Sequence, residues 1–186
     1  MVIQLATDRH KGFTLWFTGL SGSGKTTIAI EAERIFREQG YKVERLDGDE
    51  VRDYLCRDLG FSREDRDENI RRVSYLAKLL TRNEVITICC FVSPYRKARE
   101  EARELIKDFI EVFVNAPLEV CEKRDVKGLY VKARAGQILQ FTGISDPYEQ
   151  PEAPDIELRT DLFTKEDCVE QIMDFLNQRK YINLGG

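Results

Sequence analysis

A glycine-rich segment, Gly19-Leu-Ser-Gly-Ser-Gly-Lys25-Thr26, most strongly constrains what this chain can fold into. It matches the pattern GxxxxGK[ST], and it lies between a strand-like run at 13–18 and a helix-like segment at 25–39 that Gly40 would end. Glycines let successive backbone N–H groups point at phosphate oxygens, and the positive N-terminal end of the following helix adds to this attraction. The segment therefore predicts a phosphate-binding loop for a nucleoside triphosphate.

The last residues of this loop have separate chemical tasks. Lys25 supplies a cation to the β- and γ-phosphates, and the hydroxyl of Thr26 can ligate Mg²⁺. The alternative is a glycine-rich turn with a coincidental lysine, but the predicted strand and helix on either side favour the phosphate loop. We expect MgATP to be bound by Gly19, Leu20, Ser21, Gly22, Ser23, Gly24, Lys25, Thr26 and Thr27.

Strand-like and helix-like segments alternate along the rest of the chain. Further strands are expected at 42–46, 85–92, 109–114 and 156–158. Helices are expected over about 62–80, 95–107 and 169–176, with Pro117 in the first turn of another. This alternation predicts an α/β fold, in which βαβ units build a parallel sheet flanked by helices.

The segment 125–154 differs from the rest of the chain. It is rich in Gly, Lys, Arg, Pro and Tyr and has weak periodicity, so we expect a mobile lid and a substrate loop there. The length of 186 residues and the lack of a recognisable linker predict one domain over 1–186.

The composition excludes several classes of protein. Lys and Arg number 29 against 33 Asp and Glu, a formal net charge of −4, which argues against binding of nucleic acid by bulk positive charge. No apolar run approaches the roughly 18–20 residues of a membrane span. The first residues, 1–11, lack the apolar core of a signal peptide. The 5 cysteines show no CxxC or Cys/His spacing, so we expect free thiols and a cytoplasmic location.

A phosphate loop alone does not define a reaction. A GTPase would carry an Asn-Lys-x-Asp guanine reader, which this sequence lacks, and Asp125-Val-Lys-Gly128 matches DxxG only by letters because it follows a predicted helix. A small chain with a basic, glycine-containing segment late in the sequence instead indicates a P-loop kinase similar to the nucleoside-monophosphate kinases. In such enzymes a lid carries cations over the phosphoryl group that is transferred.

Polar residues follow the carboxyl ends of two predicted strands, where ligands bind in open α/β sheets. Asp47 and Asp49 follow the second strand and can hold hydrated Mg²⁺ or accept a hydrogen bond from an attacking hydroxyl, although an Asx-type turn is an alternative. Ser93 follows the third strand and fits a helix N-cap before Pro94 at the first helical position, which is compatible with a substrate contact.

The segment 61–72 is dense in polar groups. Its Ser62 and Asp65 have the spacing of a helix capping box. Arg66 and Asn69 share a helix face with Arg72, and judged alone this spacing favours a solvated charged face.

Segments along most of the chain resemble the adenylylsulfate kinase family. They are GLSGSGKTT at 19–27, LDGDEVR at 46–52, FSREDRDENIRR at 61–72, FVSPYR at 91–96, KGLYVKARAG at 127–136, FTGISDPYE at 141–149 and PEAPD at 151–155. The phosphate loop occurs in many families, whereas its combination with the segments at 61–72 and 141–149 is specific to this one. The resemblance implies transfer of the γ-phosphoryl group of MgATP to the 3′-hydroxyl of adenosine 5′-phosphosulfate (APS), by a homodimer that works in sulfate assimilation.

The same resemblance implies roles for single residues. Phe61 and Phe141 would sandwich the adenine of APS, where ring faces stack at little desolvation cost. The remaining contacts to APS would come from Arg52, Arg66 and Asn69 as a clamp on phosphosulfate and ribose, from Val92 and Ser93 in the same pocket, and from Lys127 and Gln140. Gln140 departs from the glycine often found in the family, a change that a backbone contact tolerates.

The catalytic roles are likewise implied by the resemblance. Lys25 would be catalytic through its charge on the transferred phosphates. Asp47 would orient the acceptor hydroxyl and, with Thr26, support Mg²⁺, while Asp49 would be secondary. Lys132 and Arg134 on the lid would cover the charge on the transferred group. A phosphoserine intermediate is sometimes assigned at the family position of Ser93, but we favour direct in-line transfer with Ser93 as a substrate contact. The alternatives are a small P-loop kinase for a different hydroxyl, such as that of a sugar acid, and a non-catalytic nucleotide-binding domain.

Overall fold

Five short strands form one parallel sheet in the computed structural model, which describes residues 11–183. The strands are β1 (Thr14–Thr18), β2 (Val43–Asp47), β3 (Ile86–Cys90), β4 (Phe109–Asn115) and β5 (Ile156–Arg159). They lie in the order β2-β3-β1-β4-β5, and each neighbouring pair is parallel. The central strand β1 is buried throughout, as its apolar and β-branched sequence predicts. The predicted α/β fold is confirmed.

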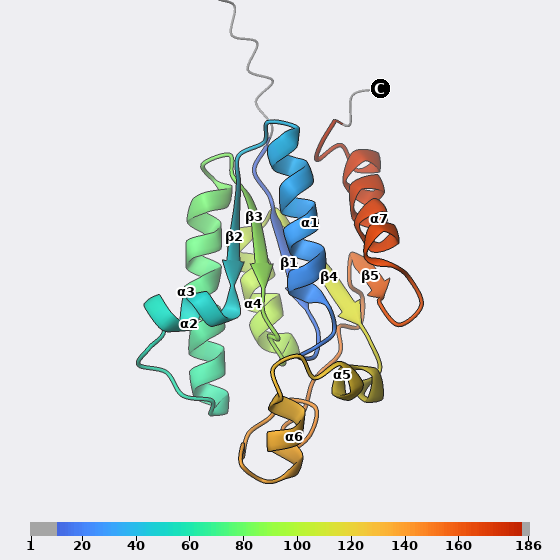
Figure 1. The fold of residues 1–186 in the computed structure, drawn as a ribbon. Helices are drawn as coiled ribbons and strands as arrows, with labels where there is room; N and C mark the ends of the chain where they lie inside the picture. The colour runs from blue at the N-terminus through green and yellow to red at the C-terminus, as the bar shows by residue number, and fades with distance from the viewer. Residues whose placement is uncertain (1–10, 184–186) are drawn as a thin grey trace, which may run out of the picture.

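Helices cover both faces of this sheet. They are α1 (Lys25–Glu38), α2 (Gly48–Tyr54), α3 (Arg63–Thr81), α4 (Arg96–Ile106), α5 (Leu118–Arg124), α6 (Leu129–Arg134) and α7 (Lys165–Gln178). Figure 1 shows α1 and α7 on one face, α3 and α4 on the other, and α5 and α6 beyond the carboxyl ends of the strands. Within residues 11–183, none of these helices has both the length and the apolar character that a membrane crossing requires.

Alternate residues of β1 belong to two separate apolar cores. Leu15 and Phe17 pack in a core that includes buried residues of α1 and α7, whereas Trp16 packs in a core with buried residues of α3 and α4. The indole of Trp16 stacks on the rings of Phe91 and Phe109, with centroids 5.9 and 5.5 Å away. Because successive strand residues face opposite sides, this one strand ties both helical layers to the sheet and fixes where the phosphate loop begins.

Two short helices, α2 and α6, lie where the sequence pattern predicts none. Seven residues form α2 and six form α6. Neither helix has enough turns to show an apolar periodicity, so the sequence pattern could not predict it. As a result the expected lid and substrate loop at 125–154 contains α6, while its remainder is irregular except for an isolated bridge between Thr142 and Asp146.

The predicted N-cap at Ser93 is wrong. Helix α4 begins at Arg96 with Tyr95 at its N-cap, and Ser93 has a φ of 38°. An N-cap residue adopts the extended region, which a positive φ excludes. Ser93 takes this conformation because its carbonyl accepts a 2.7 Å hydrogen bond from Nη1 of Arg99 and its hydroxyl accepts one of 3.1 Å from Nε1 of Trp16.

Two other helix starts differ slightly from the prediction. Pro117 occupies the N-cap of α5 instead of its first turn. At α3 the Ser62 hydroxyl accepts a 3.1 Å hydrogen bond from the backbone N–H of Asp65, as a capping box requires. The Asp65 carboxylate, however, accepts from the backbone N–H of Gly60 at 3.0 Å, so it stabilises the preceding turn.

Candidate active site

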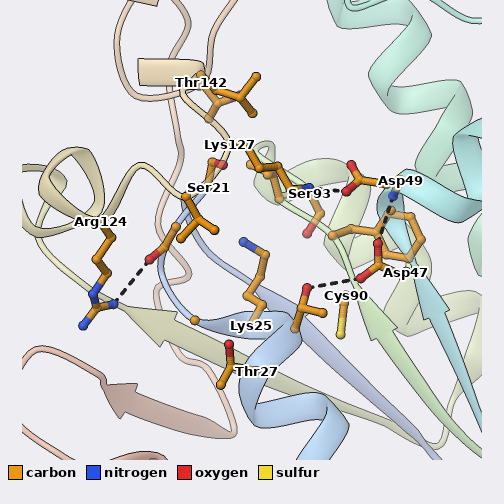
Figure 2. A pocket seen from close by; sticks show the side chains of 18 of the residues that line it. Ser21, Lys25, Thr27, Asp47, Asp49, Cys90, Ser93, Arg124, Lys127 and Thr142 are labelled. Atoms are coloured by element: carbon orange, nitrogen blue, oxygen red, sulfur yellow. Dashed lines mark hydrogen bonds and ion pairs between the residues drawn. The ribbon is translucent and has the colours of Figure 1, made fainter. Parts of the chain in front are cut away.

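A cavity of about 990 Å³ lies at the carboxyl ends of the strands. Its walls come from the phosphate loop, the β2–α2 junction, α3, the β3–α4 loop, the segments around 124–130 and 138–142, and the start of α7. Figure 2 shows Lys25 between Arg124 on one side and Asp47 with Asp49 on the other. The topology thus brings segments that are far apart in sequence to one site, as open α/β sheets do.

The phosphate loop depends on glycine at its first position. Gly19 has a φ of 146°, and a Cβ there would lie 2.4 Å from the carbonyl oxygen of Val114. No other residue type fits this close approach of two backbones. The residues of the predicted phosphate loop that line the cavity are Ser21, Gly22, Gly24, Lys25, Thr26 and Thr27, whereas Gly19, Leu20 and Ser23 do not line it.

Lys25 is buried beneath the loop. Its Nζ donates hydrogen bonds to the carbonyl oxygens of Gly19 at 2.8 Å and Leu20 at 2.7 Å. Burial lowers the pKa of Lys25 to about 8, because the charged ammonium loses hydration. A bound anion, such as a nucleotide phosphate, would therefore stabilise the charged form of Lys25.

Asp47 ends β2 and forms the Asx-type turn that was one of the two predicted alternatives. Its Oδ1 accepts a 3.1 Å hydrogen bond from the backbone N–H of Asp49, which caps α2 in the manner of an Asx turn. Its Oδ2 accepts a 3.1 Å hydrogen bond from the hydroxyl of Thr26 and lies 3.6 Å from Nη1 of Arg45. The cap therefore uses one carboxylate oxygen and leaves the other facing the phosphate loop.

The residues at this point fit a Mg²⁺ ion that arrives with a nucleotide. Among residues 11–183, no group of three or more His, Cys, Asp and Glu side chains is arranged to hold a metal alone. The hydroxyl of Thr26 and the carboxylate of Asp47 instead offer adjacent oxygen ligands, which hard cations prefer. Such a pair suits a cation that takes its other ligands from phosphate oxygens and water.

Arg66 links the two segments that carry the predicted stacking rings. Its Nε donates to the carbonyl oxygen of Phe61 at 2.8 Å, its Nη1 donates to the hydroxyl of Thr142 at 2.7 Å, and its Nη2 donates to the carbonyl oxygen of Gln140. Phe141 lies between the last two, so one guanidinium connects the backbone beside both rings. Phe61 and Phe141 both line the cavity.

Two neighbouring guanidinium groups favour an anion at this end of the cavity. The guanidinium carbon of Arg52 lies 4.4 Å from the ring centroid of Phe61, and that of Arg66 lies 5.8 Å from it. Burial and the charge of Arg66 lower the pKa of Arg52. Because the two cations repel each other, a phosphate or sulfate bound between them would lower the electrostatic energy.

Asn69 lines the cavity and carries a polar atom without a hydrogen-bond partner. The side chain is 5 % exposed, and its Oδ1 is buried without a hydrogen-bond partner. Leaving such an acceptor unpaired costs free energy, so its presence in a cavity wall indicates a donor on a ligand, such as a hydroxyl.

Ser93 and Val92 line the same cavity, but the hydroxyl of Ser93 is engaged. Ser93 is 2 % exposed, and its Oγ accepts the hydrogen bond from Trp16. Across the cavity mouth, Lys127 and Asp49 form an ion pair between exposed side chains (Figure 2). Gln140 also lines the cavity, so this structure brings all of the predicted acceptor residues together.

The two predicted lid cations are not brought to the cavity. Lys132 and Arg134 belong to α6 and do not line it, and Arg134 pairs with Glu122 at 2.5 Å. Arg124, which sequence reasoning missed, does line it. Its Nη2 donates to the carbonyl oxygen of Thr160 at 2.6 Å, which joins the end of α5 to the β5–α7 loop.

The sequence reasoning also missed the wall beside the phosphate loop. This wall consists of Thr160, Phe163, Thr164, Lys165 and Cys168. These residues follow the four-residue strand β5, and the one local signal among them is the capping-box spacing of Thr164 with Asp167 at the start of α7, which predicts a helix start but no ligand contact. The position of Arg124 directly before the basic lid segment is a signal that could have been used.

Comparison with known proteins identifies the family. The adenylylsulphate kinase family model matches residues 11–159. An adenylyl-sulfate kinase of Halothermothrix orenii is 67% identical over 175 residues, which cover 94% of this chain and 95% of that protein. The structure of the Mycobacterium tuberculosis APS kinase in complex with AMPPNP and APS matches with a TM-score of 0.87 at 45% identity, covering 90% of this chain and 99% of that chain. A hexameric APS kinase from Thiobacillus denitrificans matches with a TM-score of 0.73 at 34% identity, covering 94% of this chain and 30% of that chain. The chain belongs to the adenylylsulfate kinase family.

Proposed function

We propose that this chain transfers the γ-phosphoryl group of MgATP to the 3′-hydroxyl of APS, giving 3′-phosphoadenosine 5′-phosphosulfate and ADP. One observation carries the proposal: the phosphate loop and the two ring-bearing segments line the same cavity of about 990 Å³. A donor and an acceptor nucleotide can therefore meet there without leaving the protein. The high identity to adenylyl-sulfate kinases supports the choice of acceptor.

The donor would bind at the phosphate-loop end. Backbone N–H groups of the loop and the start of α1 would hold the β- and γ-phosphates, and the Lys25 ammonium would neutralise part of their charge. Thr26 and Asp47 would hold Mg²⁺, which would supply positive charge to offset the negative charge of the phosphates. Arg124 and Phe163 line the cavity beside this loop, where they would contact the rest of the donor.

The acceptor would bind between the rings at the other end. Phe61 and Phe141 would stack on its adenine, and stacking of this kind contributes about 1–3 kcal/mol per base. Arg52 and Arg66 would hold the phosphosulfate, since a planar guanidinium matches an oxyanion in geometry and charge. The unpartnered Oδ1 of Asn69 would accept a hydrogen bond from a ribose hydroxyl. Lys127 and Gln140 would complete this end.

Transfer would occur directly between the two substrates. Oδ2 of Asp47 would orient the 3′-hydroxyl, and because a loose transition state releases the proton late, orientation matters more than basicity. Ser93 would contact the acceptor with the part of its hydroxyl that the bond from Trp16 leaves free. It would form no phosphoserine, because the phosphate loop already presents the γ-phosphoryl group to the acceptor. Helix α6 already contributes Leu129 and Tyr130 to the cavity wall, and Lys132 and Arg134 would cover the transferred group if their side chains turned toward it.

The test is incubation of the folded protein with MgATP and APS, followed by separation and identification of the nucleotides. The expected product is 3′-phosphorylated APS together with one ADP per transfer. ADP formed only with a sugar acid would favour a kinase for a different hydroxyl. Binding of both nucleotides without any transfer would favour a non-catalytic binding domain, and either outcome would overturn the proposal.

Three further parts of the proposal concern the whole chain. We propose that residues 1–186 act as one domain, that two copies form a homodimer, and that the protein works in the cytoplasm in sulfate assimilation. The cysteines support a reducing compartment, since Cys56, Cys89, Cys90, Cys121 and Cys168 are all buried and free. Sedimentation equilibrium tests the dimer, and a monomer at micromolar concentration would contradict it.

A further inference from the structure

Arg99, a residue outside the cavity wall, holds the strained backbone beside it. Arg99 belongs to α4 and is 3 % exposed. Its Nη1 donates a 2.7 Å hydrogen bond to the carbonyl oxygen of Ser93, whose φ of 38° is rare for a residue with a side chain. Such a conformation persists only where the surroundings determine it, and this hydrogen bond is one of its determinants.

The same guanidinium reaches a second chain segment. Its Nη2 donates a 2.7 Å hydrogen bond to the carbonyl oxygen of Glu149, at the end of the segment that carries Phe141. The backbone N–H of Glu149 in turn donates to the carbonyl oxygen of Pro94 at 2.8 Å. Arg99 therefore binds the β3–α4 loop and the segment 141–149 at once, and it sets the spacing between them.

A buried carboxylate fixes Arg99 in this position. Its Nε donates to Oε1 of Glu111 on β4 at 2.7 Å, and the Glu111 side chain is 11% exposed. A planar guanidinium with three nitrogens can serve three acceptors in fixed directions, whereas an ammonium cannot match this geometry. The arrangement is therefore specific for arginine, beyond its charge.

We propose that Arg99 is a positioning residue for the acceptor, which holds Ser93 and the Phe141 segment at the spacing that a purine nucleotide sulfate requires. The inference rests on the proposed function for the identity of that acceptor. The three nitrogens of this guanidinium donate to Glu111, Ser93 and Glu149, and none of these acceptors belongs to the phosphate loop, so the donor site should not depend on it. Loss of Arg99 should therefore affect one substrate and spare the other.

The first test compares Arg99→Lys with Arg103→Lys. Arg103 is a matched control because it lies on the same helix and approaches Glu111 at 3.6 Å, but contacts neither Ser93 nor Glu149. For Arg99→Lys we expect KM for APS to rise about tenfold, the loss of roughly one hydrogen bond to a charged group, while KM for MgATP stays within about twofold. The control variant should change neither constant.

The single tryptophan, Trp16, gives a readout that does not need turnover. Its indole N–H is bonded to Oγ of Ser93, so movement of Ser93 should change the fluorescence emission spectrum of Trp16 in Arg99→Lys and not in Arg103→Lys. If the wild-type protein failed to phosphorylate APS, the proposed function would fall, whereas this spectral comparison would still test the role of Arg99.

A second variant keeps the test valid if Arg99→Lys does not fold. Arg99→Met combined with Glu111→Leu removes both charges together, so no buried charge is left unpaired. It should show the same selective rise in KM for APS. Equal changes in both KM values, or an APS constant and a Trp16 spectrum that match those of Arg103→Lys, would overturn the proposal.

Discussion

The hydroxyl of Thr26 donates a 3.1 Å hydrogen bond to Oδ2 of Asp47, which joins the first turn of α1 to the carboxyl end of β2. Thr26 is the predicted Mg²⁺ ligand of the phosphate loop, and Asp47 is the residue that we propose to orient the acceptor hydroxyl. In the proposed mechanism, the donor and acceptor halves of the site meet at this pair of residues.

Replacement of Asp47 by asparagine should separate binding from turnover. The side chain introduced by Asp47→Asn can still cap α2, because asparagine is an equally good N-cap residue, so the fold should persist. Without the carboxylate, the acceptor hydroxyl loses its orientation, and we expect kcat to fall on the order of 100-fold. Calorimetric titration with ATP in the absence of Mg²⁺ should show nearly unchanged affinity, because the proposed contact of Asp47 with the donor runs through the ion. Unaltered kcat would remove Asp47 from the mechanism.

Nucleotide affinity should decrease as pH rises through about 8. Burial lowers the pKa of Lys25 to about 8, and only its protonated form attracts phosphate. Bound phosphate favours the charged form, so binding near this pH should take up protons, which calorimetry in buffers of different ionisation enthalpy detects. In Lys25→Arg, whose guanidinium stays charged, the uptake should vanish. A wild-type protein without proton uptake would contradict this account of Lys25.

Asn69→Ala should lower the affinity for APS more than it lowers the free energy of unfolding. The substitution removes an unpartnered buried acceptor, which offsets the packing that is lost, so the free energy of unfolding should change by less than about 1 kcal/mol. Affinity for APS should fall about tenfold, because a ribose hydroxyl loses its acceptor. Urea denaturation and APS titration measure the two effects. A destabilised protein with unchanged APS affinity would indicate a purely structural asparagine.

Ser93→Ala distinguishes direct transfer from a phosphoserine intermediate. If Ser93 is only a substrate contact, kcat should fall by less than about tenfold. Mass spectrometry of the wild-type protein, quenched with acid after mixing with MgATP, should find no added phosphate on this residue. Abolished turnover together with a phosphorylated Ser93 would refute direct transfer.

The sequence predicted the elements that have strong local signals. The glycine pattern before Lys25 located the phosphate loop, since few other arrangements need those residues at that spacing. The strands were located as short apolar runs, and α3 was located by the helical spacing of its apolar residues. The short helices α2 and α6 were not predicted, because neither has an apolar periodicity of its own. Helix α2, for example, begins where the side chain of Asp47 caps it.

For the site, sequence could name residues but could not give their mutual geometry. The N-cap predicted at Ser93 failed because two long-range donors, Trp16 and Arg99, hold it in a conformation that no local pattern encodes. Arg124 went unpredicted for a similar reason, since its role depends on a partner, Thr160, that is distant in sequence. The predicted position of Lys132 over the cavity also depended on the lid, whose place the sequence did not determine.

The double variant Phe61→Ala, Phe141→Ala tests the central claim most directly, that one cavity holds a donor phosphate tail at one end and a stacked purine at the other. Steady-state kinetics should show KM for APS raised about 100-fold or more, from the loss of two stacking contacts, with KM for MgATP changed less than about twofold. Equal increases in both constants, or an unchanged constant for APS in a folded protein, would contradict the account.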